Sequence, residues 1–177
     1  MVPHILGSYR AYLDTCTSWD LIKNSTKLFV CFGGVPLKNG QICQGGTGNH
    51  YQKESIISAA SSGIEFVNVS PLKSDLMDEA GGKWLSLRPN TDTALMLGIA
   101  HTLHIEGLSD KNFIKKYTEG FDIFLKYLLG SNDGIKKDSE WAAEICDIPS
   151  KQIKDLARKM VSNRTMISVS WSLTRQD

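Results

Sequence analysis

Four short segments combine glycine, proline, hydroxyl and basic side chains, and each directly follows a run of mostly apolar residues. Such segments suit anion binding, because glycine lets a backbone approach a phosphate closely and Lys or Arg supplies the opposite charge. The four segments are Gly33-Gly34-Val35-Pro36-Leu37-Lys38-Asn39, Ser70-Pro71-Leu72-Lys73-Ser74-Asp75, Arg88-Pro89-Asn90-Thr91-Asp92 and Ser172-Leu173-Thr174-Arg175. Together they predict a site that holds a nucleotide or a dinucleotide.

Each segment also has a plain structural interpretation. Gly33-Gly34 lacks the third glycine of the G-x-G-x-x-G fingerprint, and no glycine-rich stretch of the chain continues into the Lys-Ser or Lys-Thr of a P-loop. Asp92 suits the N-cap of a helix as well as a hydrogen bond to a base edge. Trp171 is typical of a core residue with a polar edge. The predicted site therefore depends on all four segments meeting at one edge of the fold.

The runs that precede these segments are predicted to be strands of a parallel sheet, because most of them are apolar and rich in β-branched or aromatic residues. They cover residues 27–32, 65–69, 83–87 and 165–171. Helical patterns are expected over 51–62 and 91–107, near 113–114, and over 121–129, 140–146 and 149–161. The last of these is expected to bury Ile153, Leu156, Ala157, Met160 and Val161. Strands that alternate with helices predict right-handed crossovers, which bring all four segments to the carboxyl edge of the sheet, where open α/β folds bind ligands.

The predicted fold class is α/β, with a Rossmann-like parallel sheet of about four strands and helices on both faces. Residues 1–177 are predicted to form one domain, with a helical insertion near 107–147 whose first helix is capped by Ser109 or Asp110. A domain of this length buries roughly 70% of the surface of its unfolded chain, so it needs no disulfide or metal to fold.

Composition excludes several classes of protein. Lys+Arg number 20 and Asp+Glu 19, so the chain lacks the basic footprint of a nucleic-acid binder. The longest nearly apolar run, residues 93–103, is shorter than the ~20 residues of a membrane span, and no secretory signal is visible. We therefore expect a soluble protein without a nucleic-acid partner, and the choice between cytoplasm and periplasm stays open.

Cysteine and histidine spacing does not predict a metal site. The four cysteines are scattered without a Cys-x-x-Cys pair, which favours reduced, mostly buried thiols. His101 and His104 are three residues apart on one predicted helix, but no further ligand joins them at metal-binding spacing.

In this order, the segments resemble the molybdopterin oxidoreductases. The resemblance is carried by Phe32 to Asn39, Ser70 to Lys73 and Pro89 to Gly98, and it extends through Asp110 to Asp122, Glu140 to Ile145, Arg164 to Met166 and Trp171 to Arg175. It is strongest to the branch of dimethyl sulfoxide, trimethylamine N-oxide and biotin sulfoxide reductases. Members are several times longer, so the resemblance implies an internal segment of such an enzyme, with the molybdenum-ligating serine before Met1.

The resemblance implies that this segment binds molybdopterin guanine dinucleotide with molybdenum. Residues Phe32, Gly33, Gly34, Val35, Pro36, Leu37, Lys38 and Asn39 would pass the pyrophosphate, and Ser70, Pro71, Leu72, Lys73 and Ser74 the ribose and guanine. Asn90, Thr91 and Asp92 would read the guanine edge, and Trp171, Ser172 and Arg175 would approach the pterin and the metal pocket. At Val35 and Ser70 the chain departs from many relatives, which carry an acidic residue there.

The implied reaction is oxygen-atom transfer from a small S-oxide or N-oxide to reduced molybdenum, followed by re-reduction by an unidentified electron donor. The segment shows no acid–base pair or nucleophile, so we assign it no catalytic or metal-ligating residue. Two alternatives stay open. One is an independent Rossmann-like enzyme that uses a nicotinamide cofactor. The missing fingerprint, and the absence of an acidic residue at the end of the second strand, disfavour it. The other is a non-catalytic binding module whose loops are only turns.

Overall fold

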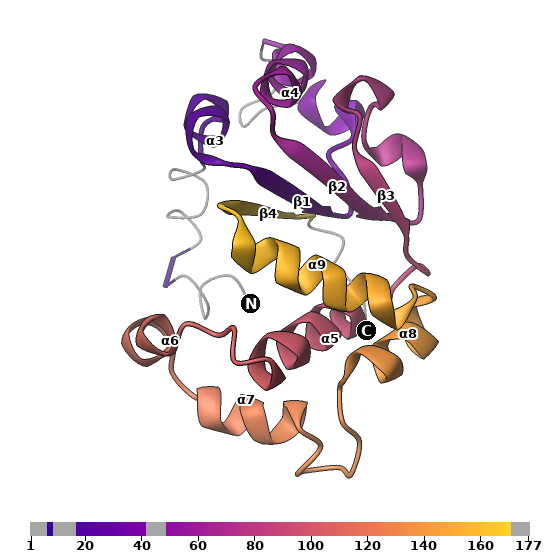
Figure 1. The fold of residues 1–177 in the computed structure, drawn as a ribbon. Helices are drawn as coiled ribbons and strands as arrows, with labels where there is room; N and C mark the ends of the chain where they lie inside the picture. Colours follow the sequence, from indigo (N-terminus) through magenta and orange to yellow (C-terminus); the bar gives the residue numbers. More distant parts are fainter. Residues whose placement is uncertain (1–6, 9–16, 42–48, 171–177) are drawn as a thin grey trace.

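The structure of the chain is a computed structural model that describes residues 7–8, 17–41 and 49–170. Strands and helices alternate along these residues (Figure 1). Their bounds, with η for 3-10 helices, are α3 Trp19–Ser25, β1 Leu28–Phe32, η1 Leu37–Gln41, α4 Gln52–Ser61, β2 Glu65–Ser70, η2 Lys73–Asp75, η3 Asp78–Ala80, β3 Lys83–Ser86, α5 Asp92–Ile105, α6 Lys111–Tyr117, α7 Phe121–Leu128, α8 Ser139–Cys146, α9 Ser150–Ser162 and β4 Thr165–Val169.

The four strands form one parallel sheet in the order β3-β2-β1-β4. Strand β2 pairs with one edge of β1, and β3 adds beyond β2 on the same side, whereas β4 pairs with the opposite edge of β1. The strand order therefore reverses between β1 and β4, and such a reversal opens a crevice at the carboxyl edge of a doubly wound sheet. The predicted Rossmann-like parallel sheet is confirmed.

Helices cover both faces of the sheet, as predicted (Figure 1). Side chains alternate along β1, so that Val30 joins the core under α5, α8 and α9, while Phe29 and Cys31 join the core under α3 and α4. All five residues of β1 are buried, because both of its faces are covered and both of its edges are paired. This strand is the rigid centre from which the glycine-containing segment emerges.

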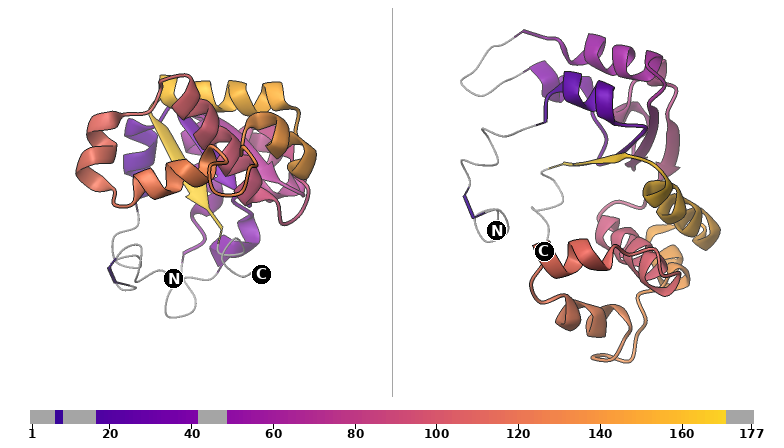
Figure 2. Two further views of the ribbon diagram at one scale, coloured as in Figure 1. Left: turned by 90° about the horizontal axis from the view of Figure 1, so that it is seen from below. Right: turned by 60° about the vertical axis from the view of Figure 1, so that its left-hand side comes forward.

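Helix α5 is packed closely against α8. A Cβ at Gly98 would stand 2.7 Å from the Cβ of Ala142, so the contact requires glycine in the middle of α5. Ala142 and Cys146 of α8 are fully buried in the core beneath α5 and α9. Within the segment 107–147, α8 is thus part of the main core, whereas α6 and α7 lie beyond α5, farther from the sheet (Figure 2).

Some local expectations were wrong. The sequence pattern did not predict α3, which begins at a Ser18 cap that accepts a hydrogen bond from the amide of Leu21. Val161 was expected to be buried, but it is 44% exposed at the end of α9, while Ile153 lies fully buried. Of the two caps predicted for α6, Asp110 is confirmed, because it accepts from the amide of Phe113 at 2.9 Å.

Candidate functional site

Three of the four predicted segments follow neighbouring strands at the carboxyl edge of the sheet. Residues 33–39 follow β1, residues 71–75 follow β2 and residues 87–92 follow β3, in strands that pair β1 with β2 and β2 with β3. We call these three segments the carboxyl rim. Because neighbouring strands lie about 4.8 Å apart, the segments after β1 and β3 are separated by about 10 Å, within the span of one nucleotide.

The segment after β1 depends on two glycines in left-handed backbone conformations. Gly33 has φ +82° and Gly34 φ +72°, a region that residues with a Cβ rarely adopt. The amide of Gly33 still donates to the carbonyl of Val69 on β2 at 2.8 Å, and the chain then turns away from the sheet. The turn continues into η1, which leaves Lys38 and Asn39 exposed to solvent.

Asp75 joins the segment after β1 to the segment after β2. Its backbone carbonyl accepts a 2.7 Å hydrogen bond from the amide of Val35, and its carboxylate accepts a 2.5 Å hydrogen bond from the hydroxyl of Ser70. The Ser70 hydroxyl also accepts from the amide of Leu72 at 3.3 Å. Ser70 is fully buried at the end of β2, so its hydroxyl serves to shape the loop in this structure.

Gln52, in the first turn of α4, supports the segment after β1 from a second direction. Its side-chain amide donates to the carbonyls of Val35 at 3.4 Å and Pro36 at 3.5 Å. A side chain at Gly40 would collide with the Gln52 side chain. The turn is therefore held on one side by the loop after β2 and on the other by α4.

The segment after β3 turns directly into α5. Asn90 has φ +69°, and the Thr91 hydroxyl donates to the carbonyl of Arg88 at 2.7 Å. Thr91 occupies the N-cap position of this 14-residue helix, but its side chain accepts no hydrogen bond from the first-turn amides. A helix start of this kind attracts anions through its amides and its dipole.

Asp92 is the first residue of α5 rather than its cap, and only 9% of it is exposed. Burial raises the pKa of its carboxyl above the usual range, and a hydrogen bond from its own backbone N–H acts in the opposite direction. A carboxylate held in this way can accept two N–H donors at once from a base edge.

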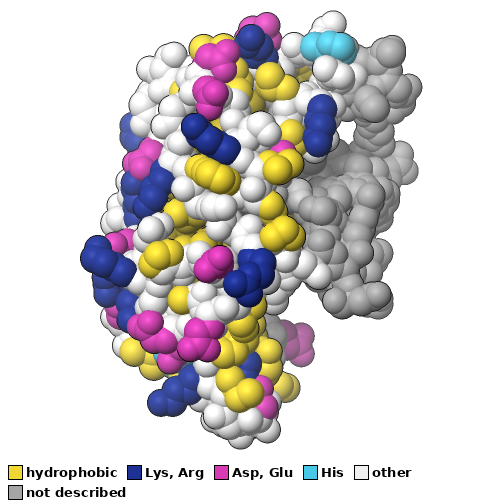
Figure 3. All heavy atoms as spheres, turned by 90° about the vertical axis from the view of Figure 1, so that its right-hand side faces the viewer, with side chains coloured by type: hydrophobic (Ala, Val, Ile, Leu, Met, Phe, Trp, Pro, Cys, Tyr) yellow, Lys and Arg dark blue, Asp and Glu magenta, His cyan; other side chains and the backbone are white. Residues whose placement is uncertain are grey.

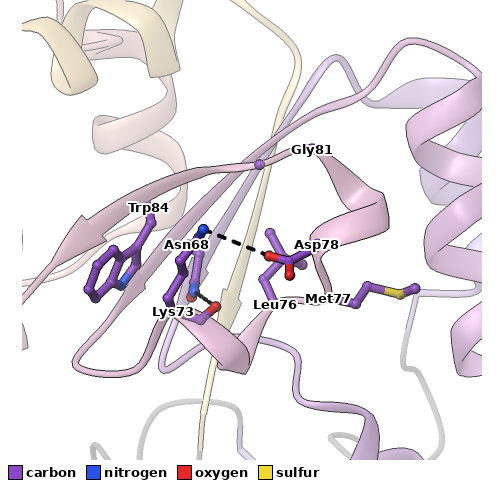
Figure 4. A pocket seen from close by; sticks show the side chains of 8 residues that line it. Asn68, Lys73, Leu76, Met77, Asp78, Gly81 and Trp84 are labelled. Carbon is purple, nitrogen blue, oxygen red and sulfur yellow. Dashed lines mark hydrogen bonds and ion pairs between the residues drawn. The ribbon is translucent and has the colours of Figure 1, made fainter.

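A pocket of about 270 Å³ lies beneath the segment after β2, between η2, η3 and β3 (Figure 4). The Asn68 side chain donates to the carbonyls of Leu72 at 3.3 Å and Lys73 at 3.2 Å. Its Oδ1 is the one buried side-chain nitrogen or oxygen atom of the described residues that has no hydrogen-bond partner. The Lys73 ammonium lies 3.9 Å from the carboxylate of Asp78. Trp84 forms one wall and donates to the carbonyl of Ser70 at 2.8 Å.

The fourth predicted segment is only partly described. The amide of Ser170 donates to the carbonyl of Phe32 at 2.9 Å, which brings the end of β4 to the start of the glycine turn. The predicted residues Trp171, Ser172 and Arg175 lie outside the described residues.

Sequence reasoning missed the residues that hold the rim in place. Asp75 lies inside the predicted segment after β2, but the residues expected to contact the ligand ended at Ser74, so Asp75 was given no role. Gln52 lies on a helix without any chemical motif. The signal at Asp75 was its spacing, because an acidic residue five positions after a buried serine can turn back to it in a tight loop. Gln52 carried no sequence signal.

Other chemistry within the described ranges is sparse. No group of three His, Cys, Asp or Glu residues there could hold a metal ion. Cys31 and Cys146 are free and buried, and burial raises the pKa of both thiols, so neither is a ready nucleophile. No helix among these residues is long and apolar enough to cross a membrane. On the face shown in Figure 3, positive and negative side chains are interspersed.

Comparison with known proteins shows which proteins the chain is similar to. The dimethyl sulfoxide/trimethylamine N-oxide reductase of Cereibacter sphaeroides is 38% identical over 175 residues, which are 99% of this chain and 21% of that protein. The chain is similar to one segment of the S-oxide and N-oxide reductases. Biotin sulfoxide reductase of the same organism is 38% identical over 97% of this chain and 23% of its own length. Trimethylamine-N-oxide reductase of Haemophilus influenzae is 39% identical over 99% of this chain and 21% of its own length.

The match covers one segment of these reductases. The chain spans about a fifth of the length of the curated relatives it matches, which confirms the resemblance to one part of much longer proteins. No protein-family model matches the chain. Among solved structures, acetylene hydratase from Pelobacter acetylenicus is similar in fold, with a TM-score of 0.62 and 20% identity over 86% of this chain and 19% of that protein.

Proposed function

We propose that this chain is the nucleotide-binding segment of a molybdenum reductase that removes oxygen from S-oxides or N-oxides. The observation that carries the proposal is the 35–39% identity to such reductases over essentially the whole chain. The proposed ligand is the guanine dinucleotide form of the molybdopterin cofactor. When bound, this group supplies the metal at which oxygen-atom transfer takes place.

The described residues fit a dinucleotide. The left-handed turn at Gly33 and Gly34 directs the chain away from the sheet, and Gly33 places no side chain between the end of β1 and a pyrophosphate. The open N-terminus of α5 offers amides to an anion, and the buried carboxylate of Asp92 offers two acceptors to the N–H groups of guanine. Lys38 and Lys73, both exposed, supply positive charge on the segments after β1 and β2.

This chain's own residues bind and orient rather than react. Residues 32–39 are proposed to contact the pyrophosphate, residues 70–74 the ribose and guanine, and residues 90–92 the guanine edge. Trp171, Ser172 and Arg175 are proposed to approach the pterin. No residue of the chain is assigned a proton-transfer or metal-ligating role, and the electron donor is not assigned.

Nucleotide titration of the chain tests the proposal against the nicotinamide alternative. Guanosine diphosphate carries the guanine, ribose and pyrophosphate of the proposed ligand, so it should bind, and NAD⁺ should not displace it. Binding of NAD⁺ without binding of guanosine diphosphate would support an independent Rossmann-like enzyme instead. Mass spectrometry of the natural protein that contains this chain should then detect a pterin guanine dinucleotide.

Activity of the isolated chain provides a second test. Because the molybdenum-ligating serine is expected outside these residues, the 177-residue chain should not reduce trimethylamine N-oxide with reduced viologen. Turnover by the chain alone would contradict the proposal that it is one segment of a longer enzyme.

A further inference from the structure

A pocket lies at the end of α5 that is remote from the carboxyl rim. Helix α5 begins at the rim with Asp92, and His104 follows twelve residues later. At 1.5 Å per residue the two positions are about 18 Å apart along the helix axis. The pocket at His104 is therefore separate from the proposed nucleotide site.

The pocket is mostly apolar and has the size of a small-molecule site. Its volume is about 420 Å³, and its lining residues come from the end of α5, the turn that follows it, α6 and the start of α7. Its lining consists of His104, Gly107, Ser109, Lys111, Ile114, Lys115 and Phe121. Ligand pockets commonly combine this volume with an apolar lining and a few polar groups.

The charged groups of this lining are all cationic side chains. Lys111 and Lys115 stand one turn apart on the same face of α6, where like charges destabilise a helix. Among the described residues, no carboxylate lies within ion-pairing distance of either ammonium. By contrast, Lys151 pairs with Asp155 at 2.8 Å, and Lys154 pairs with Glu140 at 2.9 Å. Within the described part of the chain, the two lysines that line this apolar pocket therefore have no counter-charge.

We propose that this pocket binds a small organic anion, namely a carboxylate or sulfonate carried on an apolar body of one or two rings. The body would contact Ile114 and Phe121, and the anionic group would lie between Lys111 and Lys115. The proposal is independent of the nucleotide site, since it uses none of the residues of the carboxyl rim.

Helix α6 provides its own control. Lys116 lies on another face of α6, does not line the pocket, and places its ammonium over the ring of Tyr117, 5.0 Å from the centroid. Replacing Lys116 by Gln removes the same charge from the same helix without touching the pocket. Replacing Lys111 or Lys115 by Gln removes a pocket charge and keeps a long side chain.

The test uses two matched probes, 2-naphthoate and its neutral counterpart 2-naphthamide, titrated calorimetrically into the natural protein that contains this chain. Naphthoate should bind more tightly than naphthamide, and Lys111→Gln and Lys115→Gln should each weaken naphthoate binding by about fivefold, the scale of one partly solvated ion pair. Lys116→Gln should leave it unchanged, and naphthamide binding should not respond to the lysine variants. Equal affinity for both probes, an equal loss in Lys116→Gln, or no binding of either probe would overturn the proposal.

Discussion

The backbone carbonyl of Asp75 lies where a side chain on Gly34 would have to be. A Cβ built on Gly34 would stand 2.6 Å from that oxygen, and the same oxygen accepts the hydrogen bond from the amide of Val35. The two segments are therefore joined through backbone atoms, which only glycine at position 34 permits. Position 34 therefore requires glycine for two reasons, namely this contact and its φ of +72°.

Gly34→Ala should lower both stability and nucleotide affinity. The left-handed backbone alone costs about 1–2 kcal/mol for a residue with a Cβ. Displacement of Asp75 should add about 1–3 kcal/mol, the usual cost of overpacking a tight contact. Because the displaced loop carries Ser70 and Val35, guanosine diphosphate binding should weaken as well. Urea unfolding and nucleotide titration measure the two effects.

Gly63→Ala is the matched control for this prediction. Gly63 also has a positive φ, +89°, but a Cβ there would meet no atom within 4 Å, and the residue follows α4 away from the carboxyl rim. The Gly63→Ala variant should lose only about 1–2 kcal/mol of stability, the cost of the left-handed backbone, and should keep its nucleotide affinity. Equal destabilisation by the two substitutions would show that the contact with Asp75 does not constrain the turn.

The hydroxyl of Ser70 should matter for stability more than its small size suggests. Ser70→Ala removes a 2.5 Å hydrogen bond to the Asp75 carboxylate and the acceptor for the amide of Leu72. The loss should be about 1.5–3 kcal/mol, the range for hydrogen bonds to charged groups. Ser70→Thr, which keeps the hydroxyl, serves as the conservative variant and should retain more stability than Ser70→Ala in the same denaturant titration.

The features that depend on local sequence pattern were predictable from the sequence. Strands such as β1 and β2 were predictable, because a strand buried on both faces is apolar along its whole length. The alternation with helices then implied the parallel sheet and the edge at which Gly33, Ser70 and Asn90 gather. These inferences need only local pattern and general rules of handedness.

The contacts that fix the site could not be predicted in this way. Asp75 holds Val35 through its backbone carbonyl, whose direction depends on the turn and not on the residue type. Gln52 reaches the carbonyls of Val35 and Pro36 across seventeen and sixteen positions of sequence, and nothing in its neighbours distinguishes it from a solvated residue. Val161 was misplaced because the apolar stripe of α9 continues past the last residue that the sheet covers.

Asp92→Asn should raise stability at neutral pH while it weakens guanine binding. Burial raises the pKa of Asp92, so between its unfolded and folded pKa values the folded state binds more protons than the unfolded state. By linkage, its contribution to stability is then present below the unfolded pKa and is lost as pH rises through the folded pKa. Asn removes this loss, so its melting temperature at pH 7 should exceed that of the parent, and the difference should shrink toward pH 3.

The same variant separates a binding role from a structural one. A carboxylate accepts two N–H donors from guanine, whereas an Asn amide offers one acceptor, so guanosine diphosphate affinity should fall by about 1–3 kcal/mol. Adenosine diphosphate lacks that donor pair and should lose much less. Unchanged guanosine diphosphate affinity in Asp92→Asn would remove this residue from the proposed site.

The packing of α5 on α8 predicts a pair of substitutions that compensate each other. Gly98→Ala should lower the free energy of unfolding, because the added methyl would stand 2.7 Å from the Cβ of Ala142 and the overpacking cost of about 1–3 kcal/mol exceeds the gain of about 1 kcal/mol in helix propensity. Ala142→Gly alone should lose about 1 kcal/mol of helix propensity and also the contacts of the buried methyl.

In the double variant the methyl has only moved from one helix to the other, so the double variant should be more stable than the sum of the single losses implies. Chemical denaturation of all four proteins measures this coupling, which should exceed about 0.5 kcal/mol. Strictly additive losses would mean that the two helices separate freely and that Gly98 is not required by the contact.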